Sequence, residues 1–181
     1  MPGILAPMSK YLDAVDHFTA TANAITDWNA ATPCEGWVGT DVINHMLTAQ
    51  RHIFETNGAD LGAEPSGDGA ARWAAHAAAV RPYASDPAFL SKEFEGRMGP
   101  STVEATLESM IAFDVLVHAW DISANTANTV QYTPAELAFL DEVISGLPPA
   151  AFDGPAFGKP VEAPAGANAA DKLMARIGRK R

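Results

Sequence analysis

Residues 114–121, with the sequence DVLVHAWD, place a carboxylate and an imidazole four residues apart inside an apolar run. On a helix, positions i and i+4 lie one above the other on the same face, so Asp114 and His118 would point into the same space. A buried carboxylate is costly unless it meets a cation or a hydrogen-bond donor. The stretch therefore predicts either a simple hydrogen bond between Asp114 and His118 or two ligands of a divalent metal ion.

A third ligand for such an ion has to come from elsewhere in the chain, and His45 is the candidate. It lies in the segment 41–47, DVINHML, whose apolar positions predict a second helix. Three protein ligands leave a tetrahedral ion one position short and an octahedral ion three short, so water, a thiol or a substrate would complete the shell. Imidazole and carboxylate ligands suit zinc, nickel, iron and manganese alike.

Asp121, three residues beyond His118, has two readings. It could accept a hydrogen bond from the ring nitrogen of His118 that does not touch the metal, or it could bond local backbone or pair with a cation. His52 lies about two turns from His45, ~10.5 Å along the helix axis, and cannot share its metal. His17 and His76 have no partner at ligand spacing, and we interpret them as surface or packing residues.

Cys34 and two tryptophans near the predicted ligands are interpreted as structural. Cys34 precedes the helix that carries His45, but no cation that would favour its thiolate is close in sequence. We expect Trp37 and Trp120 to pack in the core rather than stack on a substrate. Because Trp120 directly follows the ligand motif, an aromatic edge of the pocket stays open as an alternative.

The composition favours an ordinary globular protein. The chain has 181 residues, 48% of them hydrophobic, which suits one domain spanning residues 1–181. A net charge of −10 argues against nucleic acid as a partner, and we read the basic residues of 176–181 as a solvated helix end. A single cysteine, no signal-peptide pattern in residues 1–10 and no membrane-spanning run lead us to expect a cytoplasmic protein.

The spacing of apolar residues predicts an all-α fold. Helices are expected at about 11–25, 41–56, 68–83, 101–125, 134–146 and 171–177. Thr40 and Asp41 offer N-cap chemistry, and Pro82 should stop the third helix. The segment 58–69 is expected to be a loop, and 89–99 an extended or hairpin-like crossover. The result is a four-helix bundle with a long crossover, a Pro/Gly-rich tail (148–181) packed on it and a short C-terminal helix.

Three motifs in order, TPCEGW at 32–37, DVINH at 41–45 and DVLVHAWD at 114–121, resemble the actinobacterial metal-binding branch of the DinB-like superfamily. Its relatives include the mycothiol-dependent maleylpyruvate isomerases. Segments 157–161 and 171–179 are similar to the C-terminal signature of that branch. The resemblance implies a DinB-like bundle, a divalent metal at His45, Asp114 and His118, and a homodimer. For some relatives it also implies thiol-dependent transfer or isomerisation.

The chain departs from the maleylpyruvate isomerases in two respects. The resemblance implies that those enzymes have glutamate at the position of Asp114. The aspartate side chain is shorter by one methylene, so its carboxylate reaches less far. They also have a further C-terminal domain, for which this chain has no room. Isomerase activity on maleylpyruvate is therefore not expected to transfer intact.

Three functions remain open. The first is a metal-dependent enzyme that uses zinc or nickel. With mycothiol as cosubstrate, it would act as a thiol-dependent transferase or isomerase on a small molecule. The sequence identifies no general acid or base for this reaction. The second is a non-catalytic metal-binding or stress-associated dimer. The third is a small-molecule-binding bundle without metal.

Two further expectations concern surfaces. The open side of the metal should face loop 58–69, crossover 89–100 and the tail after Pro148. The dimer should use exposed apolar residues such as Phe139 and Leu140.

Overall fold

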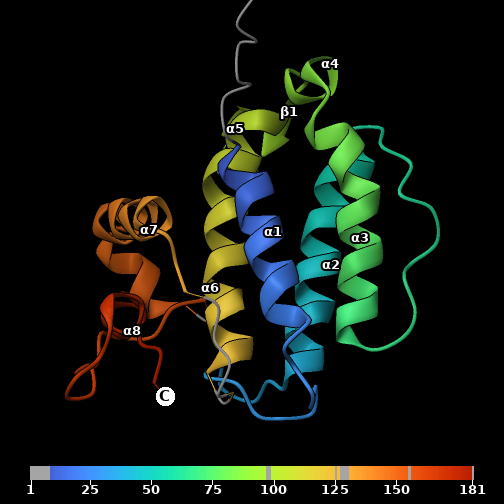
Figure 1. The fold of residues 1–181 in the computed structure, drawn as a ribbon. Helices are drawn as coiled ribbons and strands as arrows, with labels where there is room; N and C mark the ends of the chain where they lie inside the picture. The colour runs from blue at the N-terminus through green and yellow to red at the C-terminus, as the bar shows by residue number, and fades with distance from the viewer. Residues whose placement is uncertain (1–8, 97–98, 125, 127–130, 155, 181) are drawn as a thin grey trace, which may run out of the picture.

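Four helices lie side by side along most of the molecule: α1 (Lys10–Ala22), α2 (Gly39–Thr56), α3 (Gly69–Ala84) and α6 (Ala112–Ser123) (Figure 1). The computed structural model describes residues 9–96, 99–124, 126, 131–154 and 156–180. Helix α1 packs against α6 and α3, and α2 packs against α3 and α6. The protein is mostly helical, as predicted. Expectations about residues 1–8, the fourth helix end at Asn125 and the basic residue Arg181 lie outside the described residues.

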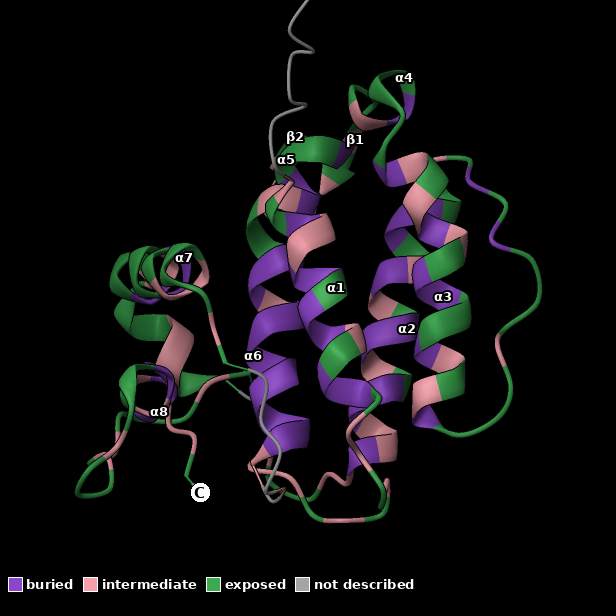
Figure 2. Ribbon diagram, viewed as in Figure 1, coloured by how far each residue is buried: buried purple, intermediate pink, exposed green. Residues whose placement is uncertain are grey.

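The core lies between these helices, and it explains the apolar run around His118. Large buried side chains come from all four helices, among them Tyr11, Phe18, Ile43, Phe54, Trp73 and Leu116. Helix α6 is buried on nearly every side (Figure 2), because α7 (Pro134–Gly146) also packs against it. Asp114 is the single residue of α6 that is not buried. A helix covered on both faces needs apolar residues all round, and so it shows no polar face in sequence.

The crossover between α3 and α6 contains a β-hairpin. After the short helix α4 (Pro87–Leu90), strand β1 (Glu93–Gly96) pairs antiparallel with β2 (Gly99–Thr102). The hairpin-like crossover is therefore a true two-stranded sheet. Thr102 then caps α5 (Val103–Thr106), its hydroxyl accepting from the Ala105 N–H at 3.1 Å.

A π-helical segment, η1 (Leu107–Ile111), joins α5 to α6 and was not predicted. Glu108 in this segment accepts hydrogen bonds from the backbone N–H of Lys10, at 2.8 Å, and from the Ser9 hydroxyl. It thus satisfies donors at the start of α1, which would otherwise have no helical partner.

The predicted start of α2 is displaced by two residues, whereas the predicted end of α3 near Tyr83 agrees with the structure within one residue. Helix α2 begins at Gly39 rather than near Asp41, because Asp41 acts one turn in: its carboxylate accepts from the Val38 N–H at 2.9 Å. Helix α3 continues through Pro82 to Ala84. A proline so close to the end costs only one hydrogen bond of the last turn.

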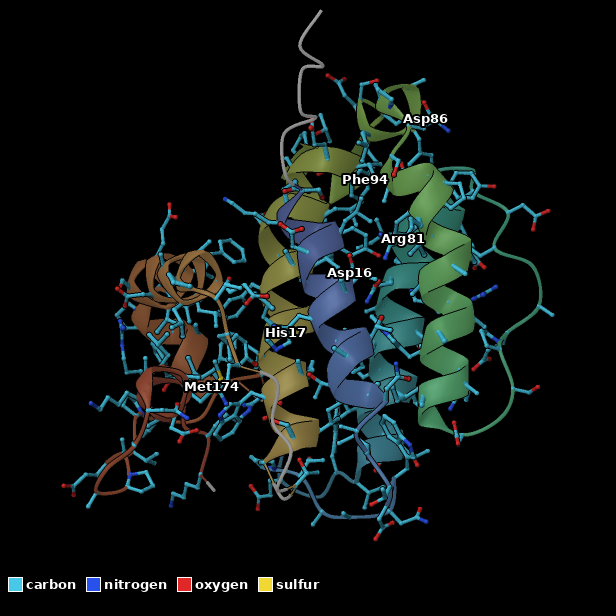
Figure 3. All side chains as sticks on the ribbon, viewed as in Figure 1. Asp16, His17, Arg81, Asp86, Phe94 and Met174 are labelled. Atoms are coloured by element: carbon cyan, nitrogen blue, oxygen red, sulfur yellow. The ribbon has the colours of Figure 1, made fainter. Side chains whose placement is uncertain are left out.

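Ion pairs and hydrogen bonds tie the outer helices to α1. Arg81 of α3 pairs with Asp16 of α1 (Figure 3). The Glu136 carboxylate of α7 accepts from the Thr133 N–H at 2.7 Å and lies 2.9 Å from Nδ1 of His17.

The expectation that Phe139 and Leu140 are exposed is wrong. Phe139 is 8% exposed and Leu140 is fully buried, and the helix that carries them, α7, packs against α6. The tail continues through η2 (Pro149–Asp153) to α8 (Ala169–Arg176), which packs against α7. Among the described helices, none has the length and apolar character needed to cross a membrane.

Candidate metal centre

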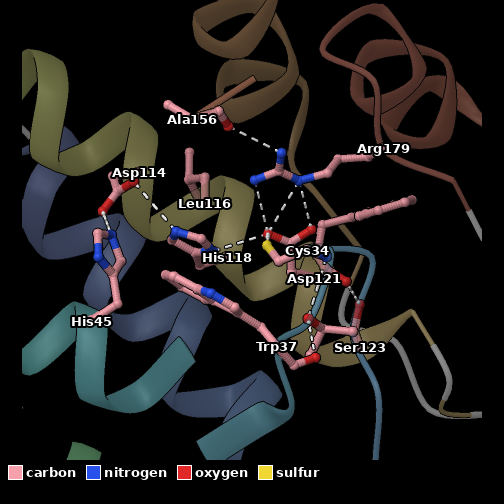
Figure 4. Close-up of polar contacts among 12 residues, drawn as sticks. Cys34, Trp37, His45, Asp114, Leu116, His118, Asp121, Ser123, Ala156 and Arg179 are labelled. Carbon is pink, nitrogen blue, oxygen red and sulfur yellow. Dashed lines mark hydrogen bonds and ion pairs between the residues drawn. The ribbon is translucent and has the colours of Figure 1, made fainter. Parts of the chain in front are cut away.

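The three predicted ligands meet where α2 faces α6 (Figure 4). Nε2 of His45 lies 3.2 Å from Oδ2 of Asp114, and Nε2 of His118 lies 3.5 Å from Oδ1 of the same carboxylate. One donor atom from each residue lies within 4.8 Å of the other two. The structure thus brings together the residues that sequence spacing singled out.

These spacings suit a small divalent ion. With bonds of 2.0–2.2 Å to nitrogen and oxygen, a tetrahedral ion holds its ligand atoms roughly 3.3–3.6 Å apart. The two separations from Asp114, each to a different carboxylate oxygen, are close to that range. The side chains of His45 and Asp114 are 36% and 32% exposed, so the group is open on one side.

The second ring nitrogen of His118, Nδ1, lies against Asp121. Nδ1 of His118 lies 2.9 Å from Oδ2 of Asp121, whose side chain is fully buried. If Nδ1 carries the proton, Nε2 presents its lone pair toward His45 and Asp114, and such a hydrogen bond fixes the tautomer of metal-binding histidines. Asp121 also pairs with the guanidinium of Arg179, Nε lying 3.0 Å from Oδ1. Asp121 therefore contacts His118 and also pairs with a cation, while its role behind a metal ligand stays a prediction.

The carboxylates around His118 govern its charge. Burial alone would lower the pKa of the imidazole, but Asp114 on one side and Asp121 on the other raise it to about 10. Burial would likewise raise the pKa of Asp114, but the charge of His118 and the hydrogen bond from His45 hold it below its usual value. Without metal, a proton therefore balances the carboxylates at neutral pH, and a metal ion would displace it from Nε2.

Cys34 belongs to a second group of potential ligands, with His118 and Asp121. Its thiol donates to Oδ2 of Asp121 at 3.1 Å. A cation already sits at this group, because Arg179 pairs with Asp121. The group with His45 is therefore the better candidate for holding an ion. The sequence reading of a partly buried Cys34 is right, but the statement that no cation is near holds only in sequence, because Arg179 comes from the far end of the chain.

The open side of the centre carries an aromatic wall formed by Trp37. Its ring centroid lies 5.4 Å from that of His45 and 6.1 Å from that of His118, nearly parallel to the latter. A cavity of about 560 Å³ opens here, lined by Gly36, Trp37, Asp41, Asn44, His45, Thr48 and Ala49. Trp120 packs in the core, as predicted: it is buried and donates from Nε1 to Asp171. The aromatic edge of the cavity comes from Trp37.

The expected surroundings of the open side need correction as well. None of the residues lining the cavity comes from loop 58–69, crossover 89–100 or the tail. The β-hairpin lies at the end of the molecule where α5 begins (Figure 1). The loop is linked to the cavity lining through Arg72, which donates to the Pro65 carbonyl at 3.2 Å and to Oδ1 of Asn44 at 2.7 Å. The tail reaches His118 from behind, through Asp121.

The remaining histidines lie away from the centre. His52 is exposed on α2. His17 and His76 are packing residues, as predicted, but both are buried rather than on the surface. Nε2 of His76 lies 3.2 Å from Oε1 of Gln50, to which the Tyr11 hydroxyl donates at 2.6 Å.

The fold and the site together define a mostly helical protein with a group of residues between two helices that could hold a metal ion. Over 138 residues the chain is 33% identical to "Uncharacterized protein Rv0738" and to "Uncharacterized protein MT0763", both of Mycobacterium tuberculosis. Each match covers 73% of this chain and 73% of the relative. The chain belongs to the family of these mycobacterial proteins. No family model and no solved structure matches it.

Proposed function

We propose that this protein binds a divalent metal ion through His45, Asp114 and His118, within a DinB-like four-helix bundle formed by α1, α2, α3 and α6. One observation carries the proposal: two imidazole nitrogens and both oxygens of one carboxylate meet at metal-ligand spacing, across two helices. The donors also suit the ion. Zinc and nickel both accept imidazole and carboxylate ligands, and we propose one of these two.

The proposal extends to chemistry at the open side. A divalent ion with three protein ligands supplies Lewis-acid activation of a thiol or a carbonyl group. The cavity beside His45 is shallow and open to solvent, and Trp37 offers a flat apolar wall to a substrate that approaches there. We propose a thiol-dependent transferase or isomerase with mycothiol as the thiol cosubstrate, a step that rests on the sequence resemblance. A homodimer is proposed on the same ground.

Metal analysis of protein purified without a nickel column tests the metal site. We expect about one zinc or nickel ion per chain in the wild type. His118→Ala should lose most of it, because the substitution removes a ligand that two carboxylates orient. Asp114→Asn should weaken binding, because a neutral amide is a poorer donor to a divalent cation. His52→Ala is the matched control, since it removes an exposed histidine of α2. Equal metal content in all four proteins would place the ion elsewhere.

Thiol dependence tests the enzymatic part. The zinc-loaded and nickel-loaded proteins are incubated with a small electrophile and mycothiol, with cysteine in place of mycothiol, or with no thiol. We expect mycothiol to be consumed faster with wild type than with His118→Ala. Identical rates of mycothiol consumption in these two proteins would contradict the enzymatic part and favour a non-catalytic metal-binding protein.

A further inference from the structure

We propose that Arg179 is a positioning residue for the metal centre: it fixes Asp121, which in turn orients the imidazole of His118. This inference rests on the proposed metal site and adds a part of the chain that contributes no ligand. The relevant contacts run from the C-terminal segment, through one buried carboxylate, to the back of a metal ligand (Figure 4).

Asp121 is the middle residue of this relay from Arg179 to His118, and contacts to both of its oxygens hold its carboxylate in place. Oδ2 is 2.9 Å from Nδ1 of His118 and accepts from the Cys34 thiol at 3.1 Å. Arg179 contacts both oxygens, with Nε 3.0 Å from Oδ1 and Nη2 3.4 Å from Oδ2. A guanidinium that donates to both oxygens fixes the plane of a carboxylate as well as its position.

Arg179 is itself held in place. Its side chain is 10% exposed, and its Nη1 donates to the Ala156 carbonyl at 3.1 Å. Just before it, Gly178 has a φ of +82°, a conformation that favours glycine. A Cβ on Gly178 would lie 2.5 Å from the Cα of Gly158. The chain can therefore bring the guanidinium to Asp121 only if this close approach of two glycines is kept.

Loss of Arg179 has a geometric consequence for the metal centre. The buried carboxylate of Asp121 would keep one strong partner, His118, and lose the contacts that set its plane. The imidazole could then follow the carboxylate, and Nε2 would no longer be aimed at the point shared by His45 and Asp114. Loss of an outer partner of a metal-binding histidine typically weakens metal affinity 10- to 100-fold. Because Arg179 acts one step further out, we expect a loss of about tenfold.

Three variants separate this role from a general effect of the tail. Arg179→Gln removes the guanidinium. Gly178→Ala leaves every charge in place and displaces Arg179. Arg176→Gln is the matched control, because Arg176 belongs to the same segment but pairs with Asp141 on α7.

Affinity is measured by titrating zinc against a chromophoric chelator, geometry by the d–d absorption of the cobalt(II)-substituted proteins, and stability by thermal unfolding without metal. We expect Arg179→Gln and Gly178→Ala to bind zinc about tenfold more weakly and to change the cobalt spectrum, while Arg176→Gln matches wild type. Arg179→Lys, which keeps the charge but not the forked contact, should change the spectrum too.

Two results would overturn the inference. If wild type binds zinc, and Arg179→Gln and Gly178→Ala bind it within twofold with an unchanged cobalt spectrum, the relay is wrong while the metal site stands. The same holds if Arg176→Gln loses as much affinity as Arg179→Gln, since the effect is then general to the tail. If wild type itself binds no zinc, the proposed metal site fails and the relay with it.

Discussion

At the scale of single residues, two buried histidines show how surroundings decide chemistry. His118 lies between the carboxylates of Asp114 and Asp121, which raise its pKa to about 10 despite burial. His76 is equally buried but faces the neutral amide of Gln50, and burial, aided by the charge of Arg51, lowers its pKa to about 4. The same residue type thus serves as a charged centre in one place and as a neutral packing group in the other.

His76 leads to a prediction about acid stability. Its pKa is about 4 in the folded protein and about 6.5 in an unfolded chain, so below pH 6.5 the unfolded state binds a proton that the folded state refuses. The stability due to neutral His76 is present in full above pH 6.5 and is lost as the pH falls toward 4. At about 1.4 kcal/mol per pKa unit, the loss is roughly 3 kcal/mol.

Urea unfolding of wild type and His76→Gln at pH 7.5 and pH 4.5 checks this. The free energy of unfolding should fall about 2–3 kcal/mol further in wild type than in the variant, while the exposed control His52→Gln should follow wild type. Parallel pH profiles for wild type and His76→Gln would contradict it.

At the scale of the elements, the positions of the helices could be predicted from the sequence, but the structure of the segments that connect them could not. Apolar spacing and caps such as Thr133 are local, so α7 (Pro134–Gly146) starts and ends where the sequence predicts. The π-helical segment η1 depends on Glu108 reaching the start of α1, a contact between segments far apart in sequence. At the start of α2, the Thr40 N–H donates to the Trp28 carbonyl at 2.8 Å, a further contact beside the local hydrogen bond between Val38 and Asp41.

Trp28 also joins the starts of α2 and α3, and this leads to a prediction. A Cβ at Gly69 would lie 2.4 Å from the Trp28 ring, and one at Gly39 would lie 3.2 Å from it. Gly69→Ala should therefore destabilise the protein by about 1–3 kcal/mol, the usual cost of overpacking. Gly146→Ala is the control, because nothing lies within 4 Å of its Cβ and alanine favours helix. Chemical denaturation should show a lower midpoint for Gly69→Ala alone; equal midpoints would mean that the Trp28 ring moves aside freely.

At the scale of the whole molecule, part of the candidate site could be predicted from sequence and part could not. The i, i+4 spacing of Asp114 and His118 predicts two side chains on one helix face. The expectation that a second helix faces them was enough to add His45. Arg179 could not be found, because its approach depends on where the tail returns. Phe139 and Leu140 show the same limit, since a pattern identifies apolar residues but not what covers them.

The homodimer is a prediction at this scale. Since Phe139 and Leu140 are buried, it has to use other residues, and Met110 on η1 is the large hydrophobic side chain that stands exposed, at 41%, in the described part of the chain. Analytical ultracentrifugation at micromolar concentration should give twice the chain mass of 19.1 kDa, and Met110→Asp should shift the protein toward monomer. Sedimentation of wild type as a 19.1 kDa species alone would rule the dimer out.

The central claim is that His45, Asp114 and His118 hold a divalent ion, and anomalous scattering tests it most directly. Crystals of protein purified without added metal are measured on both sides of the zinc and nickel absorption edges. We predict one strong anomalous peak per chain, which appears above the absorption edge of one of the two metals and disappears below it. The peak should lie about 2.0–2.2 Å from Nε2 of His45, from Nε2 of His118 and from an Asp114 oxygen. A peak at the group formed by Cys34, His118 and Asp121, or the absence of any peak both in these crystals and in crystals soaked in zinc or nickel, would contradict it.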